Sequence, residues 1–203
     1  GSSADAAAAA ALALMVVDPP NCSPAGRTQI IHDTEGGKPC AIDGTTVAPT
    51  RLPHGLKALD DQHSIPTPGA VRAILHLHAT AGRLPLETIV TPARDLAREG
   101  FLVPENLAKV WQWRARELRD ADARRWFLPG GAAPKAGSHF THLGLARYFD
   151  LMIELGNDPF ADAVFARDIC TRLSAKGVLW QAEDLMGADP LDGEVVTYSN
   201  EDW

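Results

Sequence analysis

The sequence predicts a protein of the α/β (α+β) class, in which a small β-layer is joined to a mainly α-helical lobe. Three observations lead to this prediction. Residues 3–17 form an alanine-rich, apolar run that is typical of a buried helix. Residues 27–33 and 39–47 have the composition of two short strands joined by a turn. Most of the later chain consists of apolar runs bounded by glycine and proline, which is typical of successive helices.

The alanines at positions 6–11 indicate how the opening helix packs. Alanine favours a helix and lets neighbouring elements approach closely, so we expect this helix to lie against a sheet. The two strands that follow would form part of that sheet, and strands outside this chain the rest. A signal peptide is a poorer interpretation, because no basic segment precedes the run and Asp5 lies inside it. The run is also too short to span a bilayer.

The two strands are expected to pair as a hairpin through the turn Glu35-Gly36-Gly37. Residues 48–65 show no periodicity and are expected to form a long irregular connection. A last strand is expected to begin at Glu194. Because the chain opens on a buried helix and closes on a strand that has just begun, we expect it to be one piece of a larger protein that does not fold well alone.

Helix boundaries in the second part of the chain are marked by glycine and proline. Gly82 and Gly100 stand where glycine commonly ends a helix, and Pro104 occupies a favourable first helical position. The expected helices, with one helical turn at the end, cover residues 70–81, 86–99, 104–118, 120–127, 142–155, 160–176 and 181–185.

These elements predict three parts along the chain. Residues 1–65 would supply a helix and a hairpin to a core, residues 66–190 the helical lobe, and residues 191–203 the start of a strand that returns to the core.

Composition argues against two classes of partner. The net charge is -7, whereas phosphate binding needs clustered lysine and arginine, so no nucleic-acid partner is expected. No stretch is both basic and amphipathic, so no membrane partner is expected. Cys22, Cys40 and Cys170 have no metal-binding spacing and are expected to be buried or free thiols, with a Cys22–Cys40 disulfide as the alternative.

Histidine and acidic residues give no sign of a metal site. His76 and His78 would point about 200° apart on a helix, so they are expected to be capping or packing residues. The charged residues between 114 and 125 are expected to form ion pairs on solvated helix faces. Trp111 and Trp113 cannot both be buried on one helix face. Since no nucleophile motif or phosphate-binding loop is present, we expect no metal, no cofactor and no complete catalytic site in these residues.

Nine short segments follow one another in an order that carries a family resemblance. They are Gly1–Leu14, Val17–Pro19, Cys40–Pro49, Thr67–Val71, Gly82–Pro85, Glu99–Phe101, Phe127–Gly130, Pro134–Gly137 and Glu183–Leu185. The first looks like a Gly-Asn-Ala-Val-Asp-Ala-Ala helix, Cys40–Pro49 looks like Asp-Phe-Arg-Glu-x-Ala-Pro, and Thr67–Val71 looks like Val-Pro-Gly-Thr-Val. Together they resemble the large, N-terminal segment of the gamma-glutamyltranspeptidase family, whose members are made as precursors that cleave themselves.

The resemblance implies the four-layer αββα sandwich of the N-terminal-nucleophile hydrolases, with a mainly α-helical lobe. Family members use a threonine at the freed N-terminus of the small subunit as nucleophile, with its own α-amine as the base. The resemblance therefore implies that no catalytic residue lies in this chain. It also implies that the partner is the small subunit from the same precursor and that the substrate is a small-molecule amide.

The sequence departs from the family pattern where the substrate is bound. In place of Asp-Phe-Arg-Glu it has Asp43-Gly44-Thr45-Thr46. The Arg of that motif holds the substrate's α-carboxylate in gamma-glutamyl enzymes, and a neutral hydroxyl gives a weaker contact than a bidentate guanidinium. Thr45 and Thr46 are therefore expected to bind a substrate other than a gamma-glutamyl group.

If the substrate is still an acid, another cation must replace the missing Arg. Arg27 is the candidate because it opens the first strand, with an exposed strand-edge arginine as the alternative interpretation. Lys38 and Arg51 are weaker candidates because they lie in turns or loops. The expected function is amide hydrolysis through an acyl-enzyme. The alternatives are a genuine gamma-glutamyl transferase or hydrolase of the glutathione type and, in another class, a non-catalytic scaffold or interaction protein that retains the fold.

Overall fold

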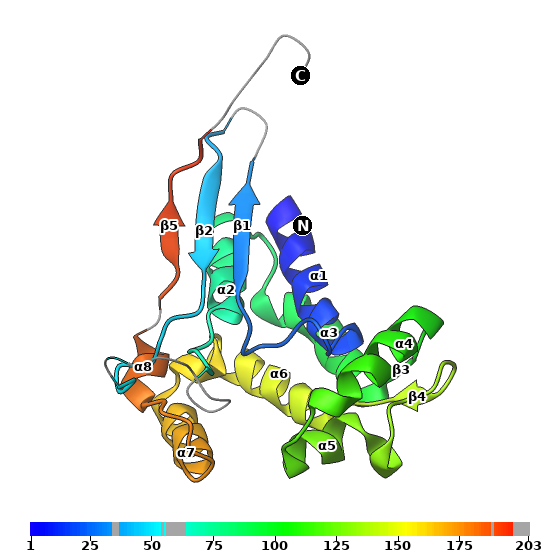
Figure 1. Ribbon diagram of the computed structural model, residues 1–203. Coiled ribbons are helices and arrows are strands. Elements are labelled where there is room, and N and C mark those ends of the chain that lie inside the picture. The colour runs from blue at the N-terminus through cyan, green and yellow to red at the C-terminus, as the bar shows by residue number, and fades with distance from the viewer. Residues whose placement is uncertain (34–36, 54, 56–63, 188, 197–203) are drawn as a thin grey trace. The chain divides into compact units, whose positions relative to one another are not determined.

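The computed structural model describes residues 1–33, 37–53, 55, 64–187 and 189–196, which fall into two compact units (Figure 1). The first unit comprises Gly1–Ala8, Pro24–Leu84 and Asn157–Trp203, and the second comprises Ala9–Ser23 and Pro85–Gly156. The three-part division predicted from the sequence, at residues 1–65, 66–190 and 191–203, stays a prediction.

The first unit is built on an antiparallel sheet with the strand order β1-β2-β5 (Figure 1). The strands are β1 (Thr28–His32), β2 (Cys40–Gly44) and β5 (Leu191–Gly193). The predicted hairpin strands are confirmed, whereas Glu35 and Gly36 of the predicted turn lie outside the described residues. The last strand begins at Leu191 instead of Glu194, because Leu191 already pairs with Asp43 of β2.

One face of this sheet is covered by helices, and we call it the closed face. Helix α2 (Ala70–Ala81) packs on β1 and β2, and the start of α1 (Ser3–Val17) joins the same core. Figure 1 shows α2 behind β1 and β2. The core consists of buried side chains that interlock between helix and sheet: Ala4, Ile42, Ala73 and Leu77. Both predicted helices are confirmed, and Ala4 at the start of α1 belongs to the core with Ile42, whereas packing of residues 6–11 against the sheet stays a prediction.

Asp5 ties the start of α1 to the loop after α2. Ser2 and Asp5 form a reciprocal capping pair, in which each backbone N–H donates to the other side chain. The Asp5 carboxylate also accepts hydrogen bonds from the backbone N–H groups of Arg83 and Leu84. Burial alone would raise the pKa of Asp5, but these amides stabilise the charged form and hold its pKa well below the usual range. This carboxylate is therefore a structural anchor.

A second buried polar link joins α2 to the 3-10 helix η3 (Pro159–Ala161). The Nε of Arg72 lies 3.3 Å from an Asp158 carboxylate oxygen, and both side chains are about 95% buried or more. The two terminal guanidinium nitrogens of Arg72 have no hydrogen-bond partner. Removing either member of such a pair is expected to cost about 3–5 kcal/mol, because the other charge would be left buried alone.

The helix predicted over residues 160–176 is divided in the structure. The 3-10 helix η3 is followed by α7 (Ala163–Ser174), and the two meet at Asp162. The Asp162 side chain accepts hydrogen bonds from the N–H groups of Val164 and Phe165, so it starts a new helix instead of continuing the previous one. The predicted turn at 181–185 is confirmed as α8 (Ala182–Met186).

The second unit is mainly helical. Its further elements are α3 (Leu86–Glu99), β3 (Phe101–Leu102), α4 (Glu105–Arg114), the 3-10 helix η1 (Ala115–Glu117), α5 (Ala121–Phe127), the 3-10 helix η2 (Pro129–Gly131), β4 (His139–Phe140) and α6 (Leu143–Leu155). Helices α3 and α6 pack against one another. The helix predicted over 104–118 ends its α-helical part at Arg114, and the antiparallel pair β3–β4 was not predicted.

The predicted α/β (α+β) class, with a sheet layer and a mainly helical lobe, is confirmed. Within the described part of the chain, no helix combines the length and apolar character that crossing a membrane requires.

Candidate functional site

The candidate site lies on the sheet face opposite the helices, which we call the open face. In the β1–β2 register Thr28 lies opposite Gly44. A Cβ at Gly44 would meet the Ala73 side chain of α2, so this pair points to the closed face. Arg27 directly precedes Thr28 and Thr45 directly follows Gly44, so both residues lie next to the same end of the hairpin, just outside its strands.

The open face carries both polar and apolar side chains. At one end it carries Arg27, Gln29 and Asp43, with Leu191 paired beside Asp43, and farther along it carries Ile31 and Ala41. Ile31 is 72% exposed and Leu191 is 67% exposed, whereas Ile42 on the closed face is 2% exposed. We call the group formed by Arg27, Gln29, Asp43 and Thr45 the polar corner; it lies beside exposed apolar side chains of the open face.

Close backbone packing fixes the position of this corner. The Gly26 carbonyl accepts hydrogen bonds from the N–H groups of Gly69 (3.1 Å) and Ala70 (3.0 Å) at the start of α2. A Cβ added at Gly69 would come within 2.5 Å of the carbonyl oxygens of Gly44 and Thr45, so only glycine fits there. The residues on either side of the candidate site are thereby held to one another and to the helix.

The polar side chains of this corner differ in whether they form hydrogen bonds. One Asp43 carboxylate oxygen accepts hydrogen bonds from the Thr45 N–H (3.0 Å) and the Gln29 side-chain amide (3.5 Å). Arg27 is exposed and forms no hydrogen bond or ion pair within the described part of the chain. Sequence reasoning missed Gln29 and Asp43, although continuing the hairpin register would have placed both beside Arg27. An exposed guanidinium without a partner can bind an anion such as a carboxylate.

A small cavity of about 240 Å³ lies in the same unit, where the chain continues beyond Thr46. Its lining residues are Val47, Ala48, Thr50, Thr67, Glu183, Asp184 and Gly187. Most of its polar atoms already have partners: the Thr67 hydroxyl donates to the Val47 carbonyl, and Asp184 accepts from the Thr50 N–H. Asp184 also forms the capping box of α8 with Gln181. These groups shape the cavity.

The remaining candidates identified in the sequence do not join the corner. Lys38 precedes β2, at the end of the strand opposite to Thr45, and Arg51 lies beyond the cavity residue Thr50. His76 bonds to Asp192 and His78 to the Leu84 carbonyl, and their expected packing or capping roles stay a prediction. The described residues contain no group of three or more potential metal ligands. All three cysteines are free, so the alternative Cys22–Cys40 disulfide was wrong.

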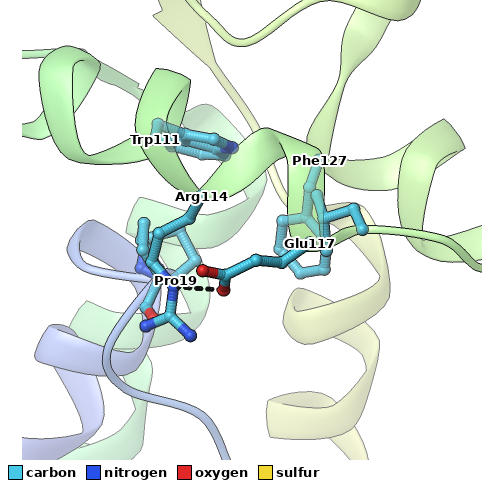
Figure 2. A pocket seen from close by; sticks show the side chains of 7 residues that line it. Pro19, Trp111, Arg114, Glu117 and Phe127 are labelled. Atoms are coloured by element: carbon cyan, nitrogen blue, oxygen red, sulfur yellow. Dashed lines mark hydrogen bonds and ion pairs between the residues drawn. The ribbon is translucent and has the colours of Figure 1, made fainter. Parts of the chain in front are cut away.

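A second pocket, of about 210 Å³, lies in the helical unit. It is lined by Pro19, Pro20, Trp111, Arg114, Glu117, Leu118 and Phe127 (Figure 2). Arg114 donates to the Pro20 carbonyl (2.6 Å) and to Glu117 (3.0 Å), as the dashed line to Glu117 in Figure 2 shows. The charged side chains that line this pocket are therefore already bonded, Arg114 to both Glu117 and the Pro20 carbonyl. Trp111 is 2% exposed and Trp113 is 59% exposed, which confirms that only one of them is buried.

An aromatic cluster in the same unit surrounds His142, the N-cap of α6. The ring stacks on Trp126 at 6.0 Å and meets Phe127 and Phe140 edge-on. Its Nδ1 accepts a hydrogen bond from the Leu145 N–H. Burial lowers the pKa of His142, partly opposed by a backbone hydrogen bond, so the ring is kept neutral as the cap requires. This histidine is structural.

Known proteins resemble this chain over nearly its whole length. The family model described as Gamma-glutamyltranspeptidase matches residues 1–198. The chain is 28% identical over 198 residues to the glutathione hydrolase proenzyme of Escherichia coli (strain K12), covering 91% of this chain and 34% of that protein. It is also 28% identical over 201 residues to scoloptoxin SSD14 of Scolopendra dehaani, covering 94% of this chain and 35% of that protein. The chain thus spans about a third of the length of these relatives.

Solved structures agree in fold. The cephalosporin acylase from Bacillus halodurans has a TM-score of 0.91 at 26% identity, covering 98% of this chain and 40% of that one. The Helicobacter pylori gamma-glutamyltranspeptidase has a TM-score of 0.89 at 22% identity, covering 98% of this chain and 61% of that one. With the family match over residues 1–198, these findings establish that the chain belongs to the gamma-glutamyltranspeptidase family, whose members are enzymes.

Proposed function

We propose that this chain is the large-subunit part of an amidohydrolase or acylase that lacks gamma-glutamyl specificity. The nucleophile would be the N-terminal threonine of a small subunit cut from the same precursor. The observation that carries the proposal is Thr45, which replaces the family's carboxylate-binding Arg and lies exposed at the end of β2. A charge-assisted hydrogen bond contributes roughly 1.5–3 kcal/mol, so its loss should weaken recognition of an α-carboxylate about 10- to 100-fold.

The proposed reaction follows the family's N-terminal-nucleophile chemistry. The threonine hydroxyl would attack the amide carbonyl while the α-amine takes its proton, and that proton would pass to the leaving amine. Water would then hydrolyse the acyl ester and restore the threonine. Thr45 and Thr46 would line the acyl-binding part of the site as neutral hydrogen-bonding groups.

The proposed partner is the small subunit from the same precursor. Exposed Ile31 and Leu191 support this, because an uncovered apolar sheet face is suited to another layer of the protein. The name of the Escherichia coli relative, a proenzyme, supports processing of a precursor.

A gamma-glutamyl hydrolase or transferase is the second candidate. It is favoured by the relatives named glutathione hydrolases, among them the Escherichia coli and human proteins. The sequence at Thr45 and Thr46 favours the first candidate.

Self-cleavage of the complete protein tests the proposed function. We expect two chains on a denaturing gel, with threonine at the N-terminus of the smaller one, and hydrolysis of a simple acyl anilide. A complete protein that stays a single chain and cleaves no amide would favour a scaffold that retains the fold.

A further inference from the structure

We propose that the pocket of the helical unit binds a small neutral aromatic molecule about the size of phenol. The pocket walls come from the Pro19–Pro20 segment after α1, from α4 and the turn that follows it, and from the end of α5 (Figure 2). The proposed amide hydrolysis makes no use of these residues, so ligand binding here can be tested separately from catalysis.

The volume of the pocket suits a single substituted ring. It holds about 210 Å³, whereas a cavity of about 150 Å³ with apolar walls is already large enough to bind benzene. Among the lining side chains, Pro19, Leu118 and Phe127 are apolar and only half-buried, so water and a small molecule can both reach them. A ring that replaces this water would remove apolar surface from solvent, which favours binding.

Two aromatic side chains of the lining favour a planar ring as the occupant. Trp111 is 2% exposed, and its ring packs edge-on against Phe140 with 4.7 Å between the ring centroids. The Phe127 ring lies 6.4 Å from the Trp111 ring at an angle of 54°. Because aromatic rings attract one another in such tilted and edge-on arrangements, a bound ring would extend an existing aromatic cluster.

Hydrogen bonds fix the walls of the pocket before any ligand binds. The Arg114 guanidinium donates to the Pro20 carbonyl (2.6 Å), which ties the segment after α1 to α4. The Arg124 guanidinium of α5 donates to the Leu118 carbonyl (3.1 Å). The Leu118 side chain also packs against the buried core of this unit. A preformed pocket keeps the entropic cost of binding low.

The charges that line the pocket favour a neutral ligand. Arg114 and Glu117 form an ion pair, with 3.0 Å between the guanidinium Nε and a carboxylate oxygen. A carboxylate ligand would lie near Glu117 and an ammonium ligand near Arg114, so either would meet a like charge. A hydroxyl can both donate and accept a hydrogen bond without adding a charge. The lining therefore predicts an uncharged ring with a hydroxyl substituent.

Leu102 provides a matched control for Leu118. Leu118 lines the pocket, whereas Leu102 lies on β3 of the same unit, is 68% exposed and is not one of the lining residues. Leu118→Trp would place a larger ring in the pocket and occupy the space that a ligand needs. Leu102→Trp makes the same chemical change where the side chain is exposed to solvent.

The experiment titrates the complete protein with p-fluorophenol and measures binding by fluorine NMR. We expect saturable binding to wild type, a loss of about tenfold or more in Leu118→Trp, and affinity within twofold of wild type in Leu102→Trp. The charged analogues p-fluorobenzoate and p-fluorobenzylamine should bind wild type about tenfold or more weakly than p-fluorophenol does.

A smaller substitution keeps the test valid if tryptophan disturbs the fold, which thermal melts of each variant report. Leu118→Phe should weaken p-fluorophenol binding to an intermediate extent. Equal affinity of wild type and both Leu118 variants would place the ligand elsewhere and overturn the proposal. Equal affinity for the three probes, or no saturable binding, would overturn it as well. None of these results bears on amide hydrolysis, which self-cleavage and anilide turnover test.

Discussion

The two faces of the β1-β2-β5 sheet are made by alternate residues of the same strands, yet they differ in almost every property. The closed face carries Ile42, which is 2% exposed, and Gly44, which leaves no space for a Cβ. The open face carries Ile31, which is 72% exposed, and the unpaired Arg27. A step of one residue along the chain thus separates groups that stabilise the fold from groups that are free to bind.

Polar groups on the two sides of the first unit follow the same division. On the helical side, Asp5 accepts several backbone amides, and Arg72 is paired with Asp158. On the open face, Arg27 has no partner within the described residues. Buried polar groups must be satisfied for the fold to form, whereas an exposed one has no such requirement. An unpaired cation at a rigid position is therefore more informative about function than a buried ion pair.

The largest expected loss of stability comes from adding a side chain at Gly69, where the start of α2 lies against the end of β2. Gly69→Ala would bring a methyl group within 2.5 Å of two backbone carbonyl oxygens, which cannot move independently of the sheet. We expect a loss of about 3 kcal/mol or more in the free energy of unfolding of the complete protein. Gly144→Ala in α6 is the matched control, since its Cβ would have ordinary contacts and alanine favours a helix. Equal stability of the two variants would contradict the tight packing at Gly69.

Substitutions on the two faces of the sheet should differ in how much stability they remove. Ile42→Ala removes a buried side chain and should destabilise the complete protein by about 3 kcal/mol. Gln29→Ala removes an exposed side chain of the open face and should change stability by less than about 0.5 kcal/mol. Denaturant titration of both variants measures the difference. Similar losses would mean that the open face contributes to the fold as much as the closed face does.

Low pH should lower the stability of the fold through protonation of Asp5. Its pKa is lowered in the folded state, so the folded protein binds fewer protons than the unfolded chain, in which an aspartate has a pKa of about 3.9. The stabilisation is therefore complete above that value and is lost as the pH falls below it. Thermal melts across this range should show a smaller acid dependence in Asp5→Asn than in wild type. Asp192→Asn, which changes an exposed carboxylate, should keep the wild-type dependence.

Much of the fold could be predicted from the sequence because its signals are local. The alanine run of α1, the glycine after α2 and the composition of β1 and β2 each report on nearby residues. The break between η3 and α7 was missed, because aspartate inside an apolar run marks a new helix only when its side chain caps it, as Asp162 does. The β3–β4 pair depends on residues almost forty positions apart, which no short pattern reports.

The candidate site could be predicted only in part. Thr45 stood out because it departs from the family pattern, and Arg27 because it opens a strand. Their placement at the same end of the hairpin depends on the strand register, and the availability of the Arg27 charge depends on what surrounds it in space. Gln29 and Asp43 carry no motif, so only the register of the predicted hairpin could have pointed to them.

The most direct test of the proposed specificity is the relative kcat/KM of the complete, processed protein for pentanoyl and gamma-glutamyl p-nitroanilide. The two substrates share a five-carbon acyl chain, and only the gamma-glutamyl compound carries the α-carboxylate and the α-amino group. With Thr45 in place of the Arg that holds the α-carboxylate in gamma-glutamyl enzymes, the gamma-glutamyl compound gains no charged contact there, so the pentanoyl compound should be hydrolysed at least as efficiently. Preference for the gamma-glutamyl compound, or efficient hydrolysis of glutathione, would contradict the account.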